Sequence, residues 1–357
     1  MKKILSLISV MLLPVAALTV SCKKIAVVPG EGQAEEESAT LTLSLSGVDT
    51  DISTRASGTA EYNGDKTASS LQFLIFDSAG NYVKKATAAG TVKLSKGMSY
   101  TVIAVVNGPE VSDLTLAQTR ATVASLANNP FVMHGQASAN LSSAASADVT
   151  VPVSSLASRV HLSSVKNNLP SAFGAITLKR VYLCNVKGQI QLDGTAVNTW
   201  YNQYGRKVLA TPITANSTTG AVDADNTGSA YTFKSYESTP ATAIAAGATF
   251  SANAYYYCFP NSLKTAIPAN LASTTTWTDQ ATWLSVCGEV NGSVYYWTVN
   301  LGAALDNGLE RNYSYDVSLT LNNLGSSDPG TQVTEASASL GISIQPWQAG
   351  SEITQTL

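Results

Sequence analysis

Apolar and polar residues alternate along most of this chain, and the alternation predicts strands rather than helices. In residues 40–46, three leucines are separated by small hydroxyl residues, which is the pattern of a strand with one buried face. Residues 71–76 and 100–106 are apolar runs, and each ends at a group of turn-forming residues. We expect a helix only at roughly 111–127. Further strands are expected near residues 82–83, 92–94, 131–134, 148–153, 158–165, 176–186, 189–193, 231–235, 250–259, 283–290, 294–301 and 313–321.

The number and spacing of these strands favour an all-β fold, either a sandwich or a barrel. β-Branched and aromatic residues fill the apolar positions, and 45% of the 357 residues are hydrophobic, so the chain can bury a large core. A chain of this length is typical of two domains. We place the boundary between them near 155–165.

The first residues have the pattern of a bacterial lipoprotein signal. Two lysines precede an apolar run that fills residues 4–20, and the small residue Ser21 stands directly before Cys22. Such a leader is removed on export, and the cysteine after the cut receives the lipid. We therefore expect residues 1–21 to be a signal peptide and Cys22 to carry a diacylglyceryl group and palmitate. A plain secretory signal with an incidental Cys22 stays open, because Leu18 lies one residue further from the cysteine than is usual.

Charge and cysteine content limit the kinds of function that the chain can have. Only 13% of the residues are charged, the net charge is -3 and no basic stripe is present, so nucleic acid is not an expected partner. Beyond Cys22 the cysteines are Cys184, Cys258 and Cys287. Their apolar, strand-like surroundings predict buried thiols. One disulfide with a spare thiol is the alternative in an oxidising compartment.

Candidate catalytic chemistry is scarce. The histidines are His134 and His161, and neither stands in a catalytic motif, so we expect both to be structural. Residues 223–228 resemble the start of a calcium loop, but Lys234 stands where the bidentate glutamate would be needed. We therefore expect no enzyme activity, no cofactor and no metal site.

Five segments carry a resemblance to a known family. They are F-L-I-F-D-S-A-G-N-Y-V (73–83), G-M-S-Y-T-V-I-A-V-V-N-G (97–108), S-R-V-H-L (158–162), R-N-Y-S-Y-D-V-S-L-T-L (311–321) and I-S-I-Q-P-W (342–347). With these segments the chain resembles the type V pilins of Bacteroidales, and within them the FimA-type family of major fimbrial subunits. The resemblance spans nearly all of the chain after the leader, and its motifs are mainly strand patterns.

The resemblance implies a fold and an assembly mechanism. Members of this family are exported as lipoproteins and have two transthyretin-like β-sandwich domains. An arginine-specific protease cuts after an arginine that follows the first strand, and the C-terminal strand of another subunit fills the groove that this strand leaves. The matching positions here are Arg55 and Ala56 for the cut, Leu41, Leu43 and Leu45 for the removable strand, and Leu340, Ile342, Ile344 and Trp347 for the donor strand.

This mechanism divides the chain into five parts. Residues 1–21 would be the signal peptide, 22–55 the lipidated propeptide, 56–160 and 161–337 the two sandwich domains, and 338–357 the donor strand. The implied partners are other copies of the chain, accessory fimbrial subunits, the protease and, before the cut, the outer membrane. The implied function is a shaft subunit of a cell-surface fimbria that supports adhesion.

The two ends of the chain fit this mechanism by their pattern alone. The segments L-T-L-S-L (41–45) and L-G-I-S-I (340–344) present the same apolar face at the same spacing, so either could fill one groove. The polar, turn-rich linker at 325–330 would let the tail leave its own domain.

Three alternatives stay open. The tail could be an ordinary terminal strand of its own subunit, and the chain could be an anchor or tip subunit of a fimbria. The third alternative is a surface glycan-binding lipoprotein, because β-sandwiches host sugar sites and aromatic rings offer apolar faces. The aromatic residues in question are Tyr255, Tyr256, Tyr257, Trp277, Trp283, Tyr295, Tyr296 and Trp297.

Overall fold

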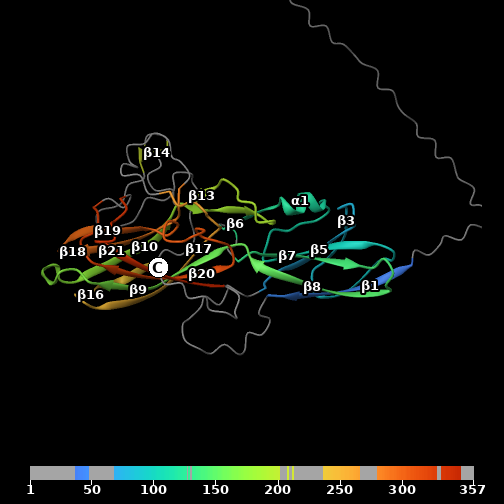
Figure 1. Cartoon of the computed structure of the whole chain (residues 1–357), viewed down its shortest axis with the longest axis horizontal. Coiled ribbons are helices and arrows are strands. Elements are labelled where there is room, and N and C mark those ends of the chain that lie inside the picture. The colour runs from blue at the N-terminus through green and yellow to red at the C-terminus, as the bar shows by residue number, and fades with distance from the viewer. Residues whose placement is uncertain are drawn as a thin grey trace, which may run out of the picture. The chain divides into compact units, whose positions relative to one another are not determined.

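The computed structural model describes residues 37–47, 68–126, 128, 131–201, 207–208, 211–212, 236–265, 280–327 and 331–346. Strands dominate these residues, as the alternation predicted (Figure 1). Within these ranges, no helix has the length and the apolar character that crossing a bilayer requires.

The first set of strands forms a seven-stranded sheet in the order β3-β2-β5-β7-β8-β1-β4. The sheet folds over one apolar core, in which Leu41 and Val149 from one end meet Phe73, Ile75 and Val102 from the other. This is the arrangement of a β-sandwich. The strands are β1 (Ser38–Ser46), β2 (Leu71–Phe76), β3 (Tyr82–Ala86), β4 (Gly90–Ser95), β5 (Ser99–Val106), β7 (Met133–Asn140) and β8 (Ser146–Ser155).

The second set forms two four-stranded sheets, in the orders β16-β10-β18-β19 and β17-β9-β20-β21. Their inner faces contribute to a second, larger core that contains Val160, Val181, Trp297 and Val317. The strands are β9 (Ser158–Asn167), β10 (Ile176–Cys184), β16 (Tyr236–Ile244), β17 (Thr249–Cys258), β18 (Trp283–Val290), β19 (Ser293–Asn300), β20 (Tyr313–Leu321) and β21 (Ala338–Pro346).

The two sets repeat one topology. The order β3-β2-β5-β7 corresponds to β16-β10-β18-β19, and β4-β1-β8 corresponds to β17-β9-β20. The strand directions correspond as well, because β1 is parallel to β8 and antiparallel to β4, while β9 is parallel to β20 and antiparallel to β17. Strand β9 therefore holds in the second set the place that β1 holds in the first. The described strands all lie in one compact unit from Glu37 onward, so the division into two domains stays a prediction.

Short elements join the two sets. Strands β8 and β9 are separated only by Leu156 and Ala157, which are both fully buried. Strand β6 (Val123–Ser125) pairs with β12 (Gln189–Gln191). A boundary after residue 160 would fall inside β9, so the strand pairing favours one at Leu156 and Ala157. The remaining elements are the 3-10 helix Ser171–Phe173, β11 (Val186–Lys187), β13 (Trp200–Tyr201), β14 (Lys207–Val208) and β15 (Thr211–Pro212).

The helix expected at 111–127 is wrong in its extent. Helix α1 covers only Leu116–Arg120 and begins at a capping box, in which Thr115 and Gln118 bond to each other's backbone N–H groups. The chain then turns into β6, because the β-branched Thr122 and Val123 favour an extended backbone and β12 offers a partner. The strand expected at 231–235 lies outside the described residues.

Candidate functional site

The place that β1 occupies is the strongest candidate for a functional site. The alternation of β1 gives it a buried face, on which Leu41 and Leu43 are 0% and 1% exposed, and Leu45 is half-buried. Strand β1 is not an edge strand, since it pairs with β8 on one side and β4 on the other. Figure 1 shows β1 in blue beside β8. Removing β1 would therefore open a slot between two strands rather than shorten an edge.

The walls of this slot are set by the register of the two ladders. On the β8 side, Leu41, Leu43 and Leu45 lie beside Ala147, Val149 and Val151 in a parallel pairing. On the β4 side, Ala39, Leu41 and Leu43 lie opposite Leu94, Val92 and Gly90 in an antiparallel pairing. The floor is the apolar face of the opposing layer, contributed by Phe73, Ile75, Val102, Ala104 and Val106.

Hydrogen bonds fix β1 on both sides of the slot. The Thr40 N–H donates to the Ala145 carbonyl at 2.9 Å, and the Ser44 hydroxyl lies 2.8 Å from the Thr150 hydroxyl. On the other side, the Lys96 N–H donates to the Glu37 carbonyl at 2.8 Å, and the two side chains form an ion pair. A strand that replaced β1 would have to satisfy these backbone groups in the same register.

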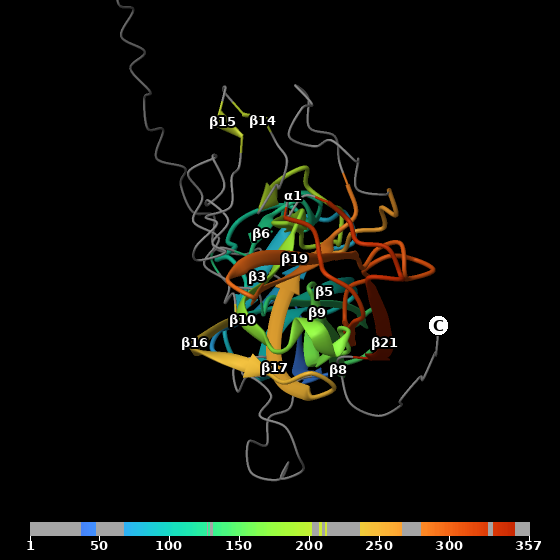
Figure 2. The same ribbon diagram turned by 90° about the vertical axis from the view of Figure 1, so that its left-hand side faces the viewer.

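The tail forms a strand of its own subunit in this structure. Strand β21 pairs antiparallel with β20 and lies at the edge of its sheet, drawn in dark red in Figure 2. The expected alternation is confirmed, because Ala338 and Ile342 are buried while Leu340 and Ile344 pack partly on the same core. An edge strand is bonded on one side only and can leave a sheet without breaking a second ladder.

The linker at 325–330 is less free than its composition suggested. Ser326 and Tyr296 exchange two backbone hydrogen bonds, with N···O distances of 2.8 and 2.9 Å. The Val333 N–H then donates to the Thr298 carbonyl at 3.0 Å. The segment before β21 is thus anchored to β19, and the tail leaves only if these bonds break as well.

The sequences of β1 and β21 match over more residues than the two apolar faces alone. Aligned without a gap, S-A-T-L-T-L-S-L-S (38–46) corresponds to S-A-S-L-G-I-S-I-Q (337–345). Ala39 and Ala338 lead both apolar faces and both are buried. Each aliphatic position of β1 has an aliphatic residue at the same position of the tail.

Several predicted site residues lie outside the described residues. They are Cys22, Arg55, Ala56 and Trp347, together with Trp277 and the calcium-like loop at 223–228. Among the residues that the structure does describe, no group of three or more histidine, cysteine or acidic side chains could hold a metal ion.

His161 is tied into a polar cluster on β9, β17 and β20. Its ring stacks on Tyr255 at 4.3 Å and 6°, its Nε2 lies 3.0 Å from Asn253 Oδ1, and its Nδ1 lies 3.4 Å from Asp316 Oδ2. Partial burial alone would raise the pKa of Asp316, but hydrogen bonds from His161 and Ser163 and the nearby positive charges outweigh it and lower that pKa. The cluster links β9, β17 and β20.

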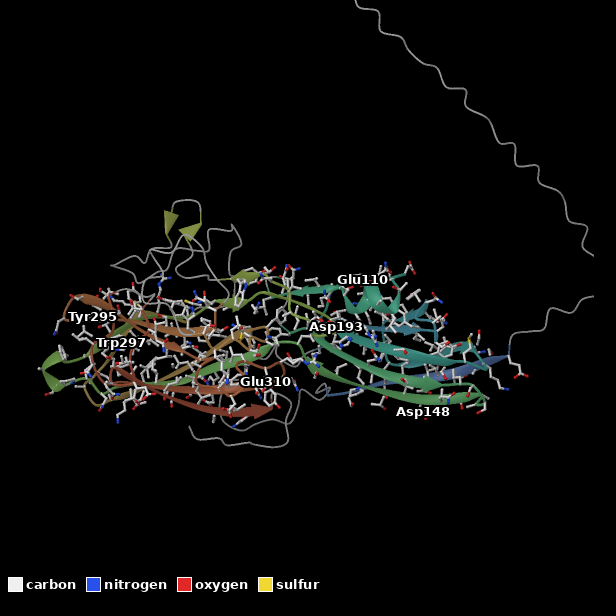
Figure 3. The ribbon with its side chains drawn as sticks, turned by 45° about the horizontal axis from the view of Figure 1, so that its top comes forward. Glu110, Asp148, Asp193, Tyr295, Trp297 and Glu310 are labelled. Carbon is white, nitrogen blue, oxygen red and sulfur yellow. The ribbon has the colours of Figure 1, made fainter. Side chains whose placement is uncertain are left out.

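His134 lies on β7, half-buried and in an electropositive setting. Burial and then the charge of Arg311 lower its pKa to about 4, with Arg120 acting in the same direction and Asp193 against it. Asp193 is labelled in Figure 3. The Nε2 atom of His134 is buried and has no hydrogen-bond partner among the described residues. The imidazole is therefore neutral at physiological pH.

This setting predicts a loss of stability in acid. The unfolded chain takes up the His134 proton near pH 6.5, whereas the folded chain resists it down to about pH 4. Stability from the neutral ring is present above pH 6.5 and is lost as the pH falls toward 4, by up to roughly 3 kcal/mol. Urea unfolding gives the free energy of unfolding of the native chain and of His134→Gln at each pH between 7 and 4. The difference between the two chains in the slope of this free energy against pH measures the contribution of His134. Equal slopes would contradict it.

The three cysteines of the described residues are free and buried, as their apolar surroundings predicted. Burial raises the pKa of Cys258 and Cys287 to about 12, and raises the pKa of Cys184 further. A thiol needs its thiolate form to react. None of the three is suited to nucleophilic chemistry.

The aromatic residues considered for glycan binding lie mostly in the core. Trp283 and Trp297 are both 0% exposed, and Tyr256 is buried with its hydroxyl donating to the Val181 carbonyl at 3.1 Å. Figure 3 shows Trp297 beside Tyr295, which is partly buried. The centroids of the two rings lie 6.5 Å apart. A ring without an accessible face cannot stack on a sugar. Trp283 and Trp297 therefore do not form a sugar platform.

The partners of β1 are the site residues that the sequence did not reveal. The expected strands near 92–94 and 148–153 were correct, but nothing in their local pattern states that both pair with residues 38–46. The exposed and half-buried residues of β4 give only a weak signal. Long-range strand pairing depends on the whole fold and not on local periodicity.

Part of the chain matches a known protein family. Residues 39–168, from β1 to the end of β9, match the family described as "Major fimbrial subunit protein (FimA)". That description names a subunit of a fimbria. The search of curated proteins found no match.

Solved structures share the fold over most of the chain. A fimbrilin from Porphyromonas gingivalis matches with a TM-score of 0.56 and 14% identity, covering 88% of this chain and 99% of its own. A "putative cell adhesion protein" from Bacteroides eggerthii matches with a TM-score of 0.57 and 18% identity, covering 87% and 96%. A protein of the same description from Parabacteroides distasonis has a TM-score of 0.57 and 15% identity, covering 87% and 99%.

Proposed function

We propose, from the match between residues 39–168 and the family of FimA-type major fimbrial subunits, that the chain is a shaft subunit that assembles by strand exchange. The chain is exported as a lipoprotein, and Cys22 anchors it in the outer membrane. An arginine-specific protease cuts it between Arg55 and Ala56, and the strand at 38–46 is lost. Residues 337–345 of another copy then fill the slot.

The observation that carries this proposal is the position-by-position match between β1 and the tail. Leu340, Ile342 and Ile344 correspond to Leu41, Leu43 and Leu45, the residues that face the floor of the slot. A strand of the same direction and register would satisfy the groups on both β8 and β4. A shift by one residue would turn every aliphatic side chain to solvent, so the register is strongly specified.

The empty slot would not persist alone. Burying Leu41 and Leu43 contributes roughly 3–6 kcal/mol before ordering costs. Without β1, the edge of β8 and an apolar floor would meet water, which is a strong driving force for association. The tail of another copy is the occupant that the sequence match favours.

The two ends together favour a shaft subunit over the other fimbrial roles. A tip subunit would need no donor strand, and an anchor would keep its lipidated first strand. This chain combines a replaceable β1 with a tail of matching pattern. The names of the similar structures support a role in cell adhesion for the assembled fimbria.

The test is the N-terminus and mass of the protein sheared from cells. We expect a ladder of multimers that begins at Ala56 and carries no lipid, while the membrane-bound precursor carries lipid on Cys22. Edman sequencing and mass spectrometry of both fractions measure this. Sheared protein that still contains residues 38–46 would contradict the proposal.

A further inference from the structure

Among the described residues, β1 is the only strand that pairs with β4. In the sheet order it is the last strand, and its six paired positions all face β1. The Lys96 N–H bond to Glu37 marks a hydrogen-bonded pair, so the alternation of an antiparallel ladder points the N–H groups of Val92 and Leu94 at β1. Loss of β1 removes these acceptors.

The other contacts of β4 lie at its ends and on two side chains. The Tyr100 hydroxyl donates to the Ser95 carbonyl at 2.8 Å, and the turn that follows is fixed by the Gly97 N–H bond to Leu141. Leu94 is buried and Val92 is partly buried, while Thr91 and Lys93 project outward. This strand is thus tethered at its ends and held along its length by β1.

Glycines stand at both ends of β4, in backbone conformations that other residues rarely adopt. Gly90 opens β4 with φ of 142°, and Gly97 follows it with φ of 88°. A Cβ at either glycine would meet no atom within 4 Å. Conformational freedom rather than close packing is therefore what glycine supplies at these two positions.

We propose that β4 is a strap that loss of β1 releases and that closes over the incoming strand of a second copy of this chain. The identity of the incoming strand, residues 337–345, rests on the proposed function. The strap gives the donor a second ladder, antiparallel on β4 in addition to the parallel one on β8. Two ladders make release slow, because both must open before the donor can leave.

The first experiment follows native-state hydrogen exchange in the intact, uncut chain. Peptides covering β4 should exchange together with those covering β1 and faster than those covering β5. Leu43→Ala, which truncates a fully buried side chain of β1, should speed exchange in both strands by the same factor, about 30-fold or more. Strand β4 exchanging more slowly than β1, or keeping its rate in this variant, would overturn the strap.

The second experiment cross-links a synthetic peptide of residues 337–347 to the chain cut after Arg55. In the inferred register, Gly341→Cys in the peptide lies opposite Thr91→Cys on β4, and Ser343→Cys lies beside Thr150→Cys on β8. Both disulfides should form. Lys93→Cys, two residues out of register on the same strand, is the control for Thr91 and should react much more slowly with the Gly341→Cys peptide.

The outcomes separate the two proposals. A cross-link to Thr150→Cys without one to Thr91→Cys means that the donor binds β8 alone, which overturns the strap and leaves strand exchange standing. No cross-link to either strand means that the tail does not enter the slot, and the proposed function fails. Hydrogen exchange in the uncut chain still decides whether β1 holds β4, because that measurement involves neither the cut nor the donor.

Discussion

The Arg55→Ala chain should accumulate as a full-length, lipid-anchored monomer, and its assembly into fimbriae should be lost almost entirely. While residues 38–46 stay in place, Leu41 and Leu43 fill the slot and β1 is bonded on both sides. An incoming tail would make the same contacts as β1, so exchanging one for the other gives no gain in free energy. Strand β1 is also covalently attached to its own subunit and therefore present at a high effective concentration. One cut after Arg55 would remove this advantage and the lipid tether together.

Immunoblots of unheated shear fractions and membrane fractions measure the effect. Thr54→Ala is the matched control, because it changes the same segment and keeps the arginine. Arg55→Lys keeps the charge but removes the arginine that the protease needs, and should behave like Arg55→Ala. If Arg55→Ala still polymerises with its first strand intact, cutting is not the trigger, and the chain is an anchor-like or uncleaved subunit.

Much of the fold could be predicted from the sequence because its strands alternate cleanly. The expected strands at 71–76, 283–290 and 313–321 match β2, β18 and β20 in both bounds. In these segments one face packs on a core and turn residues mark the ends, so the local pattern and the final fold agree. The helix expected at 111–127 failed where tertiary pairing competed with a local pattern, since β12 draws residues 123–125 into a strand.

Only one part of the candidate site could be predicted from the sequence, namely the strands that fit the slot and not the slot itself. The faces of β1 and the tail are properties of two short segments, and both were read correctly. The slot that holds β1 is built by β4 and β8, about 50 and 100 residues further along the chain, and the local periodicity of the sequence does not predict that contact. The aromatic runs suggested a glycan-binding surface for a related reason. Alternation places Tyr295 and Trp297 on one face of the sheet and Tyr296 on the other. Both faces are covered, so neither offers an open ring surface.

Replacing Ile342 by aspartate should block donation while leaving acceptance intact. Ile342 is 7% exposed on the apolar face of β21 and corresponds to Leu43, which is buried in the slot. A carboxylate at that position would stand against an apolar floor without a partner, at a cost of roughly 3 kcal/mol or more. In its own subunit the change falls on an edge strand, so β21 should loosen from β20 without unfolding the slot at the other set of strands.

Ser339→Asp is the matched control, because Ser339 is exposed on the opposite face of the same strand and should accept a charge with little effect. Circular dichroism and the cut after Arg55 check that both variants fold and are processed. Normal-length fimbriae from Ile342→Asp would mean that the tail is an ordinary terminal strand.

Mixing the two blocked chains tests the polarity of assembly. Arg55→Ala has a filled slot and an intact tail, so it can donate but not accept. Ile342→Asp has an open slot after the cut and a damaged tail, so it can accept but not donate. Together they should form heterodimers and nothing longer, with the uncut chain always the donor, as native mass spectrometry would report. Longer polymers from the mixture would mean that the tail is not the donor or that the slot of residues 38–46 is not the acceptor. The absence of any dimer would mean that the tail does not bind in the slot.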